Sequence, residues 1–324
     1  MKIEHSSKEG FREASWIQTD HKRSLQLVLV CLVLMMSGAA ALGQIVGTPG
    51  QAGPLPPPPV QGYCLAFSAN FAKMGPAGST YQPLNLSSNG TGSYTWYNPG
   101  IWYEHAAPSS NILVTTDVPP GGTATQALEL LWTKGQTPAG DTTISTTATN
   151  GSYYSGWHYG YFEVRMAWDP VVGAWPALWM QPIQNILTPG VEQGELDIFE
   201  GQGATPNFFY GTIHDWLNGV SVASNSPNNY RLAPGVNVAQ FHNYGVLWVP
   251  GQVTWYFDNW PVHSVATYPI FDNTSQLYYL MLGSQEGANW IYGNTSGVSA
   301  TSIPMYVQWV HVWQKGNGCT EQIN

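Results

Sequence analysis

From residue 63 to residue 315 the chain consists of short apolar and aromatic segments separated by turn-forming residues, and this limits the folds open to it. Gly, Asn, Pro, Ser and Thr recur throughout, and no stretch keeps a sustained helical period. Residues 161–166 alternate bulky apolar with polar side chains, as a half-buried strand does. Many such strands in one domain predict an all-β sandwich or barrel.

Two consecutive hairpins are indicated later in the chain. Residues 244–248 and 253–257 flank the sequence Val-Pro-Gly-Gln at 249–252, in which Pro-Gly suits a type II turn. Asp258-Asn259 then offers a second hairpin turn into residues 260–262. These turns predict neighbouring antiparallel strands.

Three carboxylates lie within six residues, in the run Gly-Glu-Leu-Asp-Ile-Phe-Glu at 194–200. On a regular strand Glu195 and Asp197 share a face, whereas Glu200 would lie on the opposite one. One β-bulge between Asp197 and Glu200 returns Glu200 to the face of the other two, and the three apolar residues then take the buried side. A row of acids on one face of a sheet suggests the chemistry of glycoside hydrolysis.

The charge balance bounds the partners. After residue 43 only five cations remain against fifteen acids, so this part of the chain has a net charge near −10. Such a balance argues against nucleic acid and anionic membranes as partners and favours a neutral polymer. Fifteen Trp and eighteen Tyr residues supply rings that either fill the core or stack on sugars.

The first 43 residues predict a secretory signal peptide. A polar segment at 1–23 ends in a basic pair, residues 25–36 form a nearly unbroken apolar run, and small residues follow at 37–41. The apolar run is short for a membrane span, which needs roughly 20 residues. An uncleaved signal-anchor is the alternative. We therefore expect a secreted or periplasmic protein without stable membrane association after signal cleavage.

The rest of the chain divides into a linker and one domain. Residues 44–62 are rich in Gly and Pro and predict a stiff, extended linker. The domain proper is expected over 63–324. Cys64 and Cys319 lie near its two ends, where a disulfide is open to them in an exported protein; two free thiols are the alternative.

Several motifs together resemble glycoside hydrolase family 16. The run at 194–200 has the E-x-D-x-x-E form typical of the laminarinase-like branch of that family. Four further segments resemble family motifs and occur in the family's order: YGYFEVR at 159–165, GAWPALWM at 173–180, TIH at 212–214, and the hairpin FHNYG…WYFD at 241–258.

This resemblance implies a jelly-roll sandwich of two curved antiparallel sheets with the substrate across a concave cleft. It also implies retaining hydrolysis of β-linked polysaccharides. Matched residue by residue, Glu195 is the nucleophile, Glu200 the general acid and base, and Asp197 the helper between them. Two carboxyl groups about 5–5.5 Å apart are needed for that outcome. The negative charge of Asp197 is expected to raise the pKa of Glu200.

Four residues are candidates for substrate binding. Trp175 and Trp179, an even number of steps apart, are the expected stacking residues beside the cleavage point, and Trp290 is a further groove candidate. His214 is expected to form a hydrogen bond within the catalytic site. No residue spacing indicates a catalytic metal, so no cofactor is expected. Some family members bind a structural calcium ion. No acidic loop here has the spacing of a calcium site, so this ion is not expected either, although it stays open.

The function that these patterns favour is an endo-acting hydrolase of β-1,3-glucan or mixed-linkage β-1,3-1,4-glucan, acting as a monomer. The first alternative is hydrolysis or transglycosylation of the host's own exopolysaccharide. The second is a non-catalytic glucan-binding protein, which relatives of this fold that lack the catalytic glutamates exemplify. The sequence leaves open which polysaccharide and linkage are cut and how many sugar subsites exist.

Overall fold

The computed structural model describes residues 62–81, 83–99, 106–116, 126–135, 141–203, 207–225, 230–231, 235–286, 298, 300–316 and 322–323. The expected signal peptide at 1–43 lies outside the described residues, as does all but the last residue of the expected linker at 44–62. The first strand begins at Tyr63, the residue at which the domain was expected to start.

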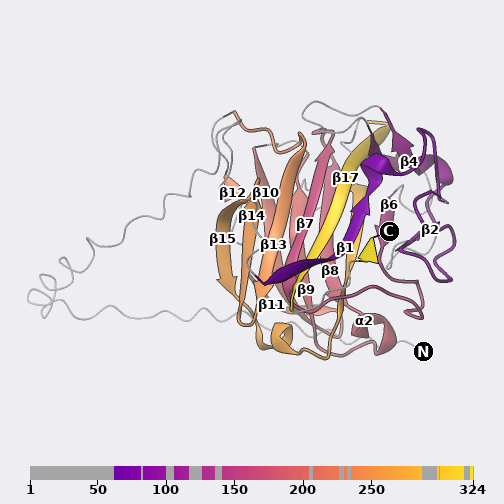
Figure 1. Ribbon diagram of the computed structural model, residues 1–324. Coiled ribbons are helices and arrows are strands. Elements are labelled where there is room, and N and C mark those ends of the chain that lie inside the picture. Colours follow the sequence, from indigo (N-terminus) through magenta and orange to yellow (C-terminus); the bar gives the residue numbers. More distant parts are fainter. Residues whose placement is uncertain are drawn as a thin grey trace, which may run out of the picture. The chain divides into compact units, whose positions relative to one another are not determined.

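The described chain folds as two packed β-sheets, each with nine strands among the described residues (Figure 1). The sheet that contains the acid run is called the cleft sheet here. Its strands, in spatial order, are β11 (Val220–Asn225), β10 (Phe208–Leu217), β9 (Gln193–Gly201), β8 (Ala174–Pro182), β16 (Tyr278–Glu286), β6 (Thr142–Ser145), β3 (Trp96–Tyr97) and β2 (Leu86–Ser87), with β12 (Tyr230–Arg231) beside β10.

The second sheet is called the facing sheet. Its spatial order is β15 (Trp260–Ala266), β14 (Gln252–Phe257), β13 (His242–Val249), β7 (Gly160–Trp168), β17 (Ser302–Lys315), β1 (Tyr63–Asn70) and β18 (Gln322–Ile323), with β5 (Ala127–Thr133) pairing β17 and β4 (Ile112–Thr115) pairing β5. The prediction of an all-β sandwich is confirmed. Two short pairs, β1–β18 and β2–β3, are parallel, whereas the remaining pairs are antiparallel as expected.

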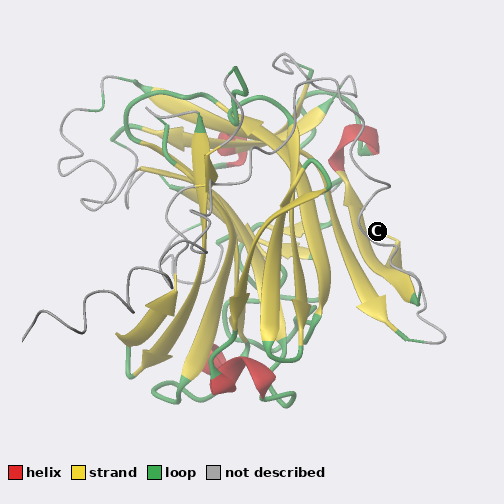
Figure 2. Cartoon of the chain, turned by 90° about the vertical axis from the view of Figure 1, so that its left-hand side faces the viewer, coloured by secondary structure: helices red, strands yellow, loops and turns green. Residues whose placement is uncertain are grey.

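Helices contribute little to the described chain, and Figure 2 shows them (red) at its margins around the strands. They are α2 (Gln184–Leu187) and the 3-10 turns η1 (Phe71–Lys73), η2 (Ser109–Asn111) and η3 (Pro269–Asp272). Within the residues that the structure describes, no helix is long and apolar enough to cross a membrane.

Both predicted hairpins are present. β13 pairs with β14 in an antiparallel register in which Val249 lies opposite Gln252. Gly251 has φ +76°, the positive value that the third position of a type II turn requires. Asp258 and Asn259 have φ +45° and +73°, which closes β14 onto β15 as a type I′ turn does.

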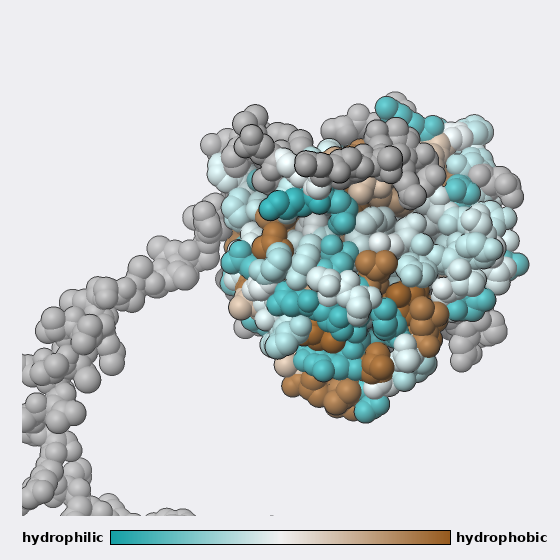
Figure 3. All heavy atoms as spheres, turned by 60° about the horizontal axis from the view of Figure 1, so that its bottom comes forward, coloured by the Kyte–Doolittle hydropathy of each residue, from teal (hydrophilic) through white to brown (hydrophobic). Residues whose placement is uncertain are grey.

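One large apolar cluster fills the space between the sheets. Its members come from both sheets, and its bulkiest fully buried side chains include Trp132, Trp248 and Trp255. Part of the aromatic excess in the sequence therefore serves the core. At the surface, the face in Figure 3 shows separate apolar groups (brown) among hydrophilic residues (teal), an ordinary distribution for a folded protein.

Candidate active site

The acid run forms strand β9, and its bulge lies where the spacing of the acids predicts it. On the β8 side, Leu178 pairs with Phe199 and Trp179 with Asp197, so β9 holds one residue more than its partner. On the β10 side, Tyr210 pairs with Glu200 and Thr212 with Asp197, and the same extra residue is present. The bulge between Asp197 and Glu200 is therefore seen from both neighbouring strands.

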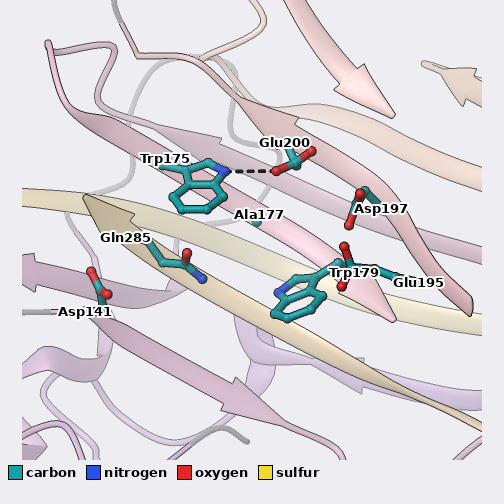
Figure 4. A pocket seen from close by; sticks show the side chains of 8 residues that line it. All are labelled: Asp141, Trp175, Ala177, Trp179, Glu195, Asp197, Glu200 and Gln285. Atoms are coloured by element: carbon teal, nitrogen blue, oxygen red, sulfur yellow. Dashed lines mark hydrogen bonds between the residues drawn. The ribbon is translucent and has the colours of Figure 1, made fainter. Parts of the chain in front are cut away.

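The bulge sorts the side chains of β9 onto two faces. Leu196, Ile198 and Phe199 are fully buried in the core between the sheets. The three carboxyl groups point the other way, into a pocket on the outer face of the cleft sheet (Figure 4). A regular strand could not place two adjacent residues, Ile198 and Phe199, in the core while keeping Glu195 and Glu200 on one face.

A hydrogen bond from the facing sheet holds the bulge. The indole Nε1–H of Trp255, in β14, donates to the backbone carbonyl of Asp197 at 2.9 Å. Gly211 of β10 lies opposite the bulge, and a Cβ at this position would come within 2.2 Å of Trp255 Nε1. Only glycine therefore leaves room for the indole to reach the carbonyl.

Glu200 is held by the strand beside it. Trp175, in β8, donates its indole N–H to Glu200 Oε1 at 3.1 Å, drawn as the dashed line in Figure 4. The predicted stacking residue Trp175 thus also contacts the predicted acid.

Glu195 and Asp197 have their own partners. The side-chain amide of Gln181, in β8, donates to Glu195 Oε2. His214, in β10, places Nε2 3.3 Å from Asp197 Oδ2 and 3.8 Å from Glu195 Oε1. His214 was expected to form a hydrogen bond within the site, and the structure places its ring beside the carboxylates of Asp197 and Glu195.

Burial raises the pKa of all three carboxyl groups. For Glu195 the pKa rises to about 8, from burial first and the neighbouring Asp197 second, against His214 and the Gln181 hydrogen bond, which lower it. For Asp197 the pKa rises to about 8 through burial alone. For Glu200 the pKa also rises to about 8, from burial and then Asp197, as expected from the sequence.

Three carboxyl groups so placed titrate as a coupled set, and their donors decide where the first negative charge resides. Glu195 has an amide donor and Glu200 an indole donor, and the imidazole of His214 lies near Glu195 and Asp197. A first negative charge on any one of the three keeps protons on the other two. The row can therefore hold one ionised and one protonated glutamate at the same time.

The acids lie where two pockets meet. Pockets of about 390 and 550 Å³ share Trp175, Glu195, Asp197 and Glu200 in their walls. The first is completed by Asp141, Ala177, Trp179 and Gln285, and the second by Tyr210, Thr212, His214, Trp216 and Ser224. The cleft therefore continues past the acid row on both sides.

The predicted binding residues are placed unequally. Trp175 and Trp179 share the cleft face of β8, because Leu178 and Met180 between and beyond them face the core. Trp290 lies outside the described residues. Of the disulfide candidates, Cys64 in β1 is disulfide-bonded, and Cys319 lies outside the described residues, so their pairing stays a prediction.

Sequence reasoning missed several residues of the site. Gln181 lies on the same face of β8 as Trp175 and Trp179, because alternate residues of a strand share a face. The alternation of the strand could therefore have predicted its position. Trp255 and Gly211 carried no such signal, because their contact joins two sheets across the core.

Glu195, Asp197 and His214 also offer ligand atoms within 4.8 Å of one another. This geometry alone is suitable for a cation. All three residues, however, belong to the carboxylate row and its imidazole, so an ion there would occupy the oxygens that the row presents to the cleft.

Comparison with known proteins fits this fold and site. The model of the family described as glycosyl hydrolases family 16 matches residues 122–297, which include the whole acid strand. The chain is 27% identical over 170 residues to a glucan endo-1,3-β-glucosidase of Niallia circulans, and 33% identical over 180 residues to an endo-1,3-1,4-β-glycanase of Rhizobium meliloti. These matches cover 48% and 54% of this chain, but 24% and 34% of the relatives, so the chain spans about a quarter to a third of their length.

Among solved structures, the catalytic domain of an endo-1,3-β-glucanase (laminarinase) from Thermotoga petrophila superimposes with a TM-score of 0.58 at 21% identity. The superposition covers 79% of this chain and 99% of that domain. The fold is thus the two-sheet jelly roll of carbohydrate-active proteins with a carboxylate row in the cleft. The chain belongs to glycosyl hydrolases family 16.

The first prediction concerns the bulge. In Trp255→Phe the ring remains but the donor to the Asp197 carbonyl is lost, so the carboxyl groups shift relative to one another. We expect kcat on a substrate that the site turns over to fall by on the order of 100-fold, since misplacement of about 1 Å costs this much. Steady-state kinetics measure it.

Trp248→Phe is the matched control for this variant. Trp248 is equally buried in the facing sheet, and its indole N–H has no hydrogen-bond partner among the described residues. It should lose stability comparably while keeping kcat within a few-fold of wild type. Equal kcat losses in the two variants would contradict a special role for Trp255.

The second prediction concerns stability and pH. Because the folded state holds a proton on Asp197 up to pH of about 8 while the unfolded chain loses it near the ordinary value of 3.8, stability falls as pH rises between these limits. Asp197→Asn removes this dependence. We expect the variant to be more stable than wild type at pH 8 and to lose this advantage at pH 4, as measured by thermal unfolding.

Asp169→Asn, at an exposed acid after β7, is the control for this experiment and should keep the wild-type pH dependence. An Asp197→Asn variant whose melting temperature followed the wild-type curve at every pH would show that Asp197 ionises normally in the folded protein.

Proposed function

We propose that the protein is a retaining endo-glycosidase that hydrolyses internal β-linkages of a neutral polysaccharide. The observation that carries this proposal is the bulged strand β9, which sets Glu195, Asp197 and Glu200 on one face in the middle of a cleft open on both sides. A cleft continuing past the acids suits a polymer bound on both sides of the bond to be cut.

The proposed reaction has two steps. The carboxylate of Glu195 attacks the anomeric carbon while Glu200 gives its proton to the departing glycosidic oxygen, leaving a glycosyl ester on Glu195. Glu200, now ionised, takes a proton from water, and the resulting hydroxide attacks the anomeric carbon and releases Glu195. Both steps invert at the anomeric carbon, so the product retains the configuration of the substrate.

The pKa directions of the carboxyl groups support these roles. Burial, and then the neighbouring Asp197, raise the pKa of Glu200 to about 8, which keeps it protonated near neutral pH as an acid must be. The donors around Glu195 lower its pKa against the effect of burial and favour the ionised nucleophile. Asp197 lies between them with His214 at hydrogen-bond distance, so it can share protons with its neighbours.

The substrate class follows from charge and from the cleft walls. Trp175 and Trp179 offer indole faces on the cleft side of β8, and the chain after residue 43 carries a net charge near −10, which disfavours anionic polymers. The family relatives are named for 1,3- and 1,3-1,4-linked β-glucans. We therefore propose β-1,3-glucan or mixed-linkage β-1,3-1,4-glucan as the substrate.

The cellular setting is likewise a proposal. The apolar segment after a basic pair near the N-terminus supports export, and a polymeric substrate is met outside the cytoplasm. We propose a secreted or periplasmic monomer.

The third prediction tests the chemistry. Glu195→Gln should abolish release of reducing ends from laminarin or lichenan while binding is preserved, and Glu200→Gln should lower kcat roughly 10²–10⁴-fold. Incubation of the wild type with laminarin, lichenan, agarose and the host's exopolysaccharide, followed by product analysis, identifies the polymer. Larger products than the substrate would reveal transglycosylation.

Azide separates the two roles. In Glu200→Ala, azide should take the place of water in the second step and give a β-glycosyl azide; in Glu195→Ala it should take the place of the nucleophile and give the α-azide. Glu163→Gln, at a buried acid of the facing sheet that accepts from Trp313, is the matched control and should keep activity. Laminarin binding by the wild type without new reducing ends would favour a binding protein.

The fourth prediction concerns metal ions. We propose that the reaction uses none, because a cation on Glu195, Asp197 and His214 would occupy the oxygen that must attack the sugar. Dialysis against a chelator should therefore leave kcat unchanged, and millimolar Zn²⁺ should inhibit competitively with the glucan. A loss of activity on chelation that Ca²⁺ or Zn²⁺ restores would contradict this.

A further inference from the structure

A line of buried polar side chains begins at Glu195. Gln181 donates its amide N–H to Glu195 Oε2, and Asn185 donates its own amide N–H to Gln181 Oε1. Asn185 also donates to Tyr279 Oη at 2.9 Å, and the Tyr279 hydroxyl lies 3.3 Å from Asn185 Oδ1. Their exposed fractions are 5% for Gln181, 7% for Asn185 and 0% for Tyr279.

The three residues come from two neighbouring strands of the cleft sheet and from the short helix that follows one of them. Gln181 lies near the end of β8, Asn185 in the short helix α2 that follows, and Tyr279 in β16 directly opposite Gln181. Tyr279 also belongs to a small apolar cluster with Ile183 and Met281, against which Trp179 packs. Apolar surroundings make each of these hydrogen bonds costly to leave unmade.

The direction of the hydrogen bonds has a chemical consequence. A glutamine side chain can present either its NH₂ or its oxygen toward a neighbour, and the two differ by a half-turn of the amide. Asn185 occupies the oxygen of Gln181 with an N–H donor, so the Gln181 NH₂ is the group that faces Glu195. The reversed amide would set its carbonyl oxygen against the carboxylate and disfavour the charged form.

We propose that Gln181 and Asn185 are positioning residues of the nucleophile: Asn185, anchored by Tyr279, orients the Gln181 amide so that Gln181 holds the Glu195 carboxylate ionised and fixed in place. This inference rests on the proposed function of Glu195. It adds a device that the carboxylate row itself does not supply, since the other two acids only push the pKa of Glu195 upward.

The groups that face Glu195 raise or lower its pKa, and Gln181 is one of those that lower it. Asp197 and Glu200 lie on its own strand β9 and raise its pKa, as burial does, whereas His214 on β10 and Gln181 on β8 lower it. Tyr279 on β16 reaches Glu195 only through the two amides. Loss of the Gln181 donor therefore leaves His214 as the one remaining group of this set that favours the ionised nucleophile.

The experiment uses Gln181→Met, which keeps length and volume and removes the donor. The acidic limb of the kcat/KM profile on the cleaved glucan should move upward by on the order of one pH unit, because hydrogen bonds to charged groups are worth about that much. KM at the pH optimum should change little. A purely structural role would lower the melting temperature and leave the acidic limb in place.

Asn185→Leu tests the relay, that is, the action of Asn185 on Glu195 through the Gln181 amide. It should move the limb in the same direction but less, because the Gln181 amide then has no fixed orientation. The double variant Gln181→Met/Asn185→Leu should show the shift of Gln181→Met alone, since Asn185 acts through Gln181. Additive shifts in the double variant would overturn the relay. Should Gln181→Met fail to fold, Asn185→Leu and Tyr279→Phe provide the same test.

Gln184→Met is the matched control. Gln184 neighbours Asn185 in α2, but its amide donates to the backbone carbonyl of Ser275 at 3.2 Å and not toward the acids. This variant should keep the wild-type acidic limb.

A second readout does not need activity. Carbon-13 NMR of protein labelled at the Glu side-chain carboxyl carbons, with Glu195→Gln to identify the Glu195 signal, gives the titration of Glu195 directly. An unchanged Glu195 titration in Gln181→Met would overturn the relay even in an active enzyme. A shifted titration in a protein that cleaves none of the four polysaccharides would sustain the relay and contradict the proposed function instead.

Discussion

The hydrogen bond between Trp255 and the Asp197 carbonyl joins the chemistry of the cleft to the packing of the core. The bulge in β9 requires one residue to leave the regular ladder, and the backbone at that point meets an indole from the facing sheet. A buried carbonyl without a donor costs about 1–3 kcal/mol. The same contact therefore contributes to the stability of the sandwich and to the spacing of the acids, with Gly211 providing the room it needs.

Three acids on one buried face raise an electrostatic problem that the neighbouring strands resolve differently for each. β8 supplies a donor at both ends of the row, Trp175 to Glu200 and Gln181 to Glu195, while β10 supplies the imidazole of His214 near the middle. The carboxyl groups thus meet unlike surroundings although they share one strand. Differences of this kind allow one acid to be charged while another keeps its proton.

Much of this arrangement could be predicted from the sequence because it depends on local periodicity. The unequal spacing of Glu195, Asp197 and Glu200 already required a bulge, and the even spacing of Trp175 and Trp179 already placed them on one face. The hairpin turns at Gly251 and Asn259 followed from the residues that tolerate positive φ. Each of these inferences uses residues within a few positions of one another.

What the sequence did not predict depends on contacts between distant segments. Trp255 reaches Asp197 across the core from another sheet, 58 residues away along the chain, and nothing local distinguishes it from the neighbouring core tryptophan Trp248. Gln181 could have been placed on the cleft face by alternation, but its direction is set by Asn185, which lies beyond the end of its strand in α2.

The same contrast explains why the acid row by itself is an incomplete description of the site. Strand geometry brings Glu195 and Glu200 to one face, but it treats two glutamates alike and cannot assign them opposite protonation states. The difference between the two glutamates comes from their separate hydrogen-bond donors on the neighbouring strand β8. Glu200 accepts from an indole, and Glu195 accepts from an amide whose orientation a second amide determines. A chain that kept the three acids and lost these neighbours would keep the spacing of the acids and lose the charge distribution that the proposed reaction requires.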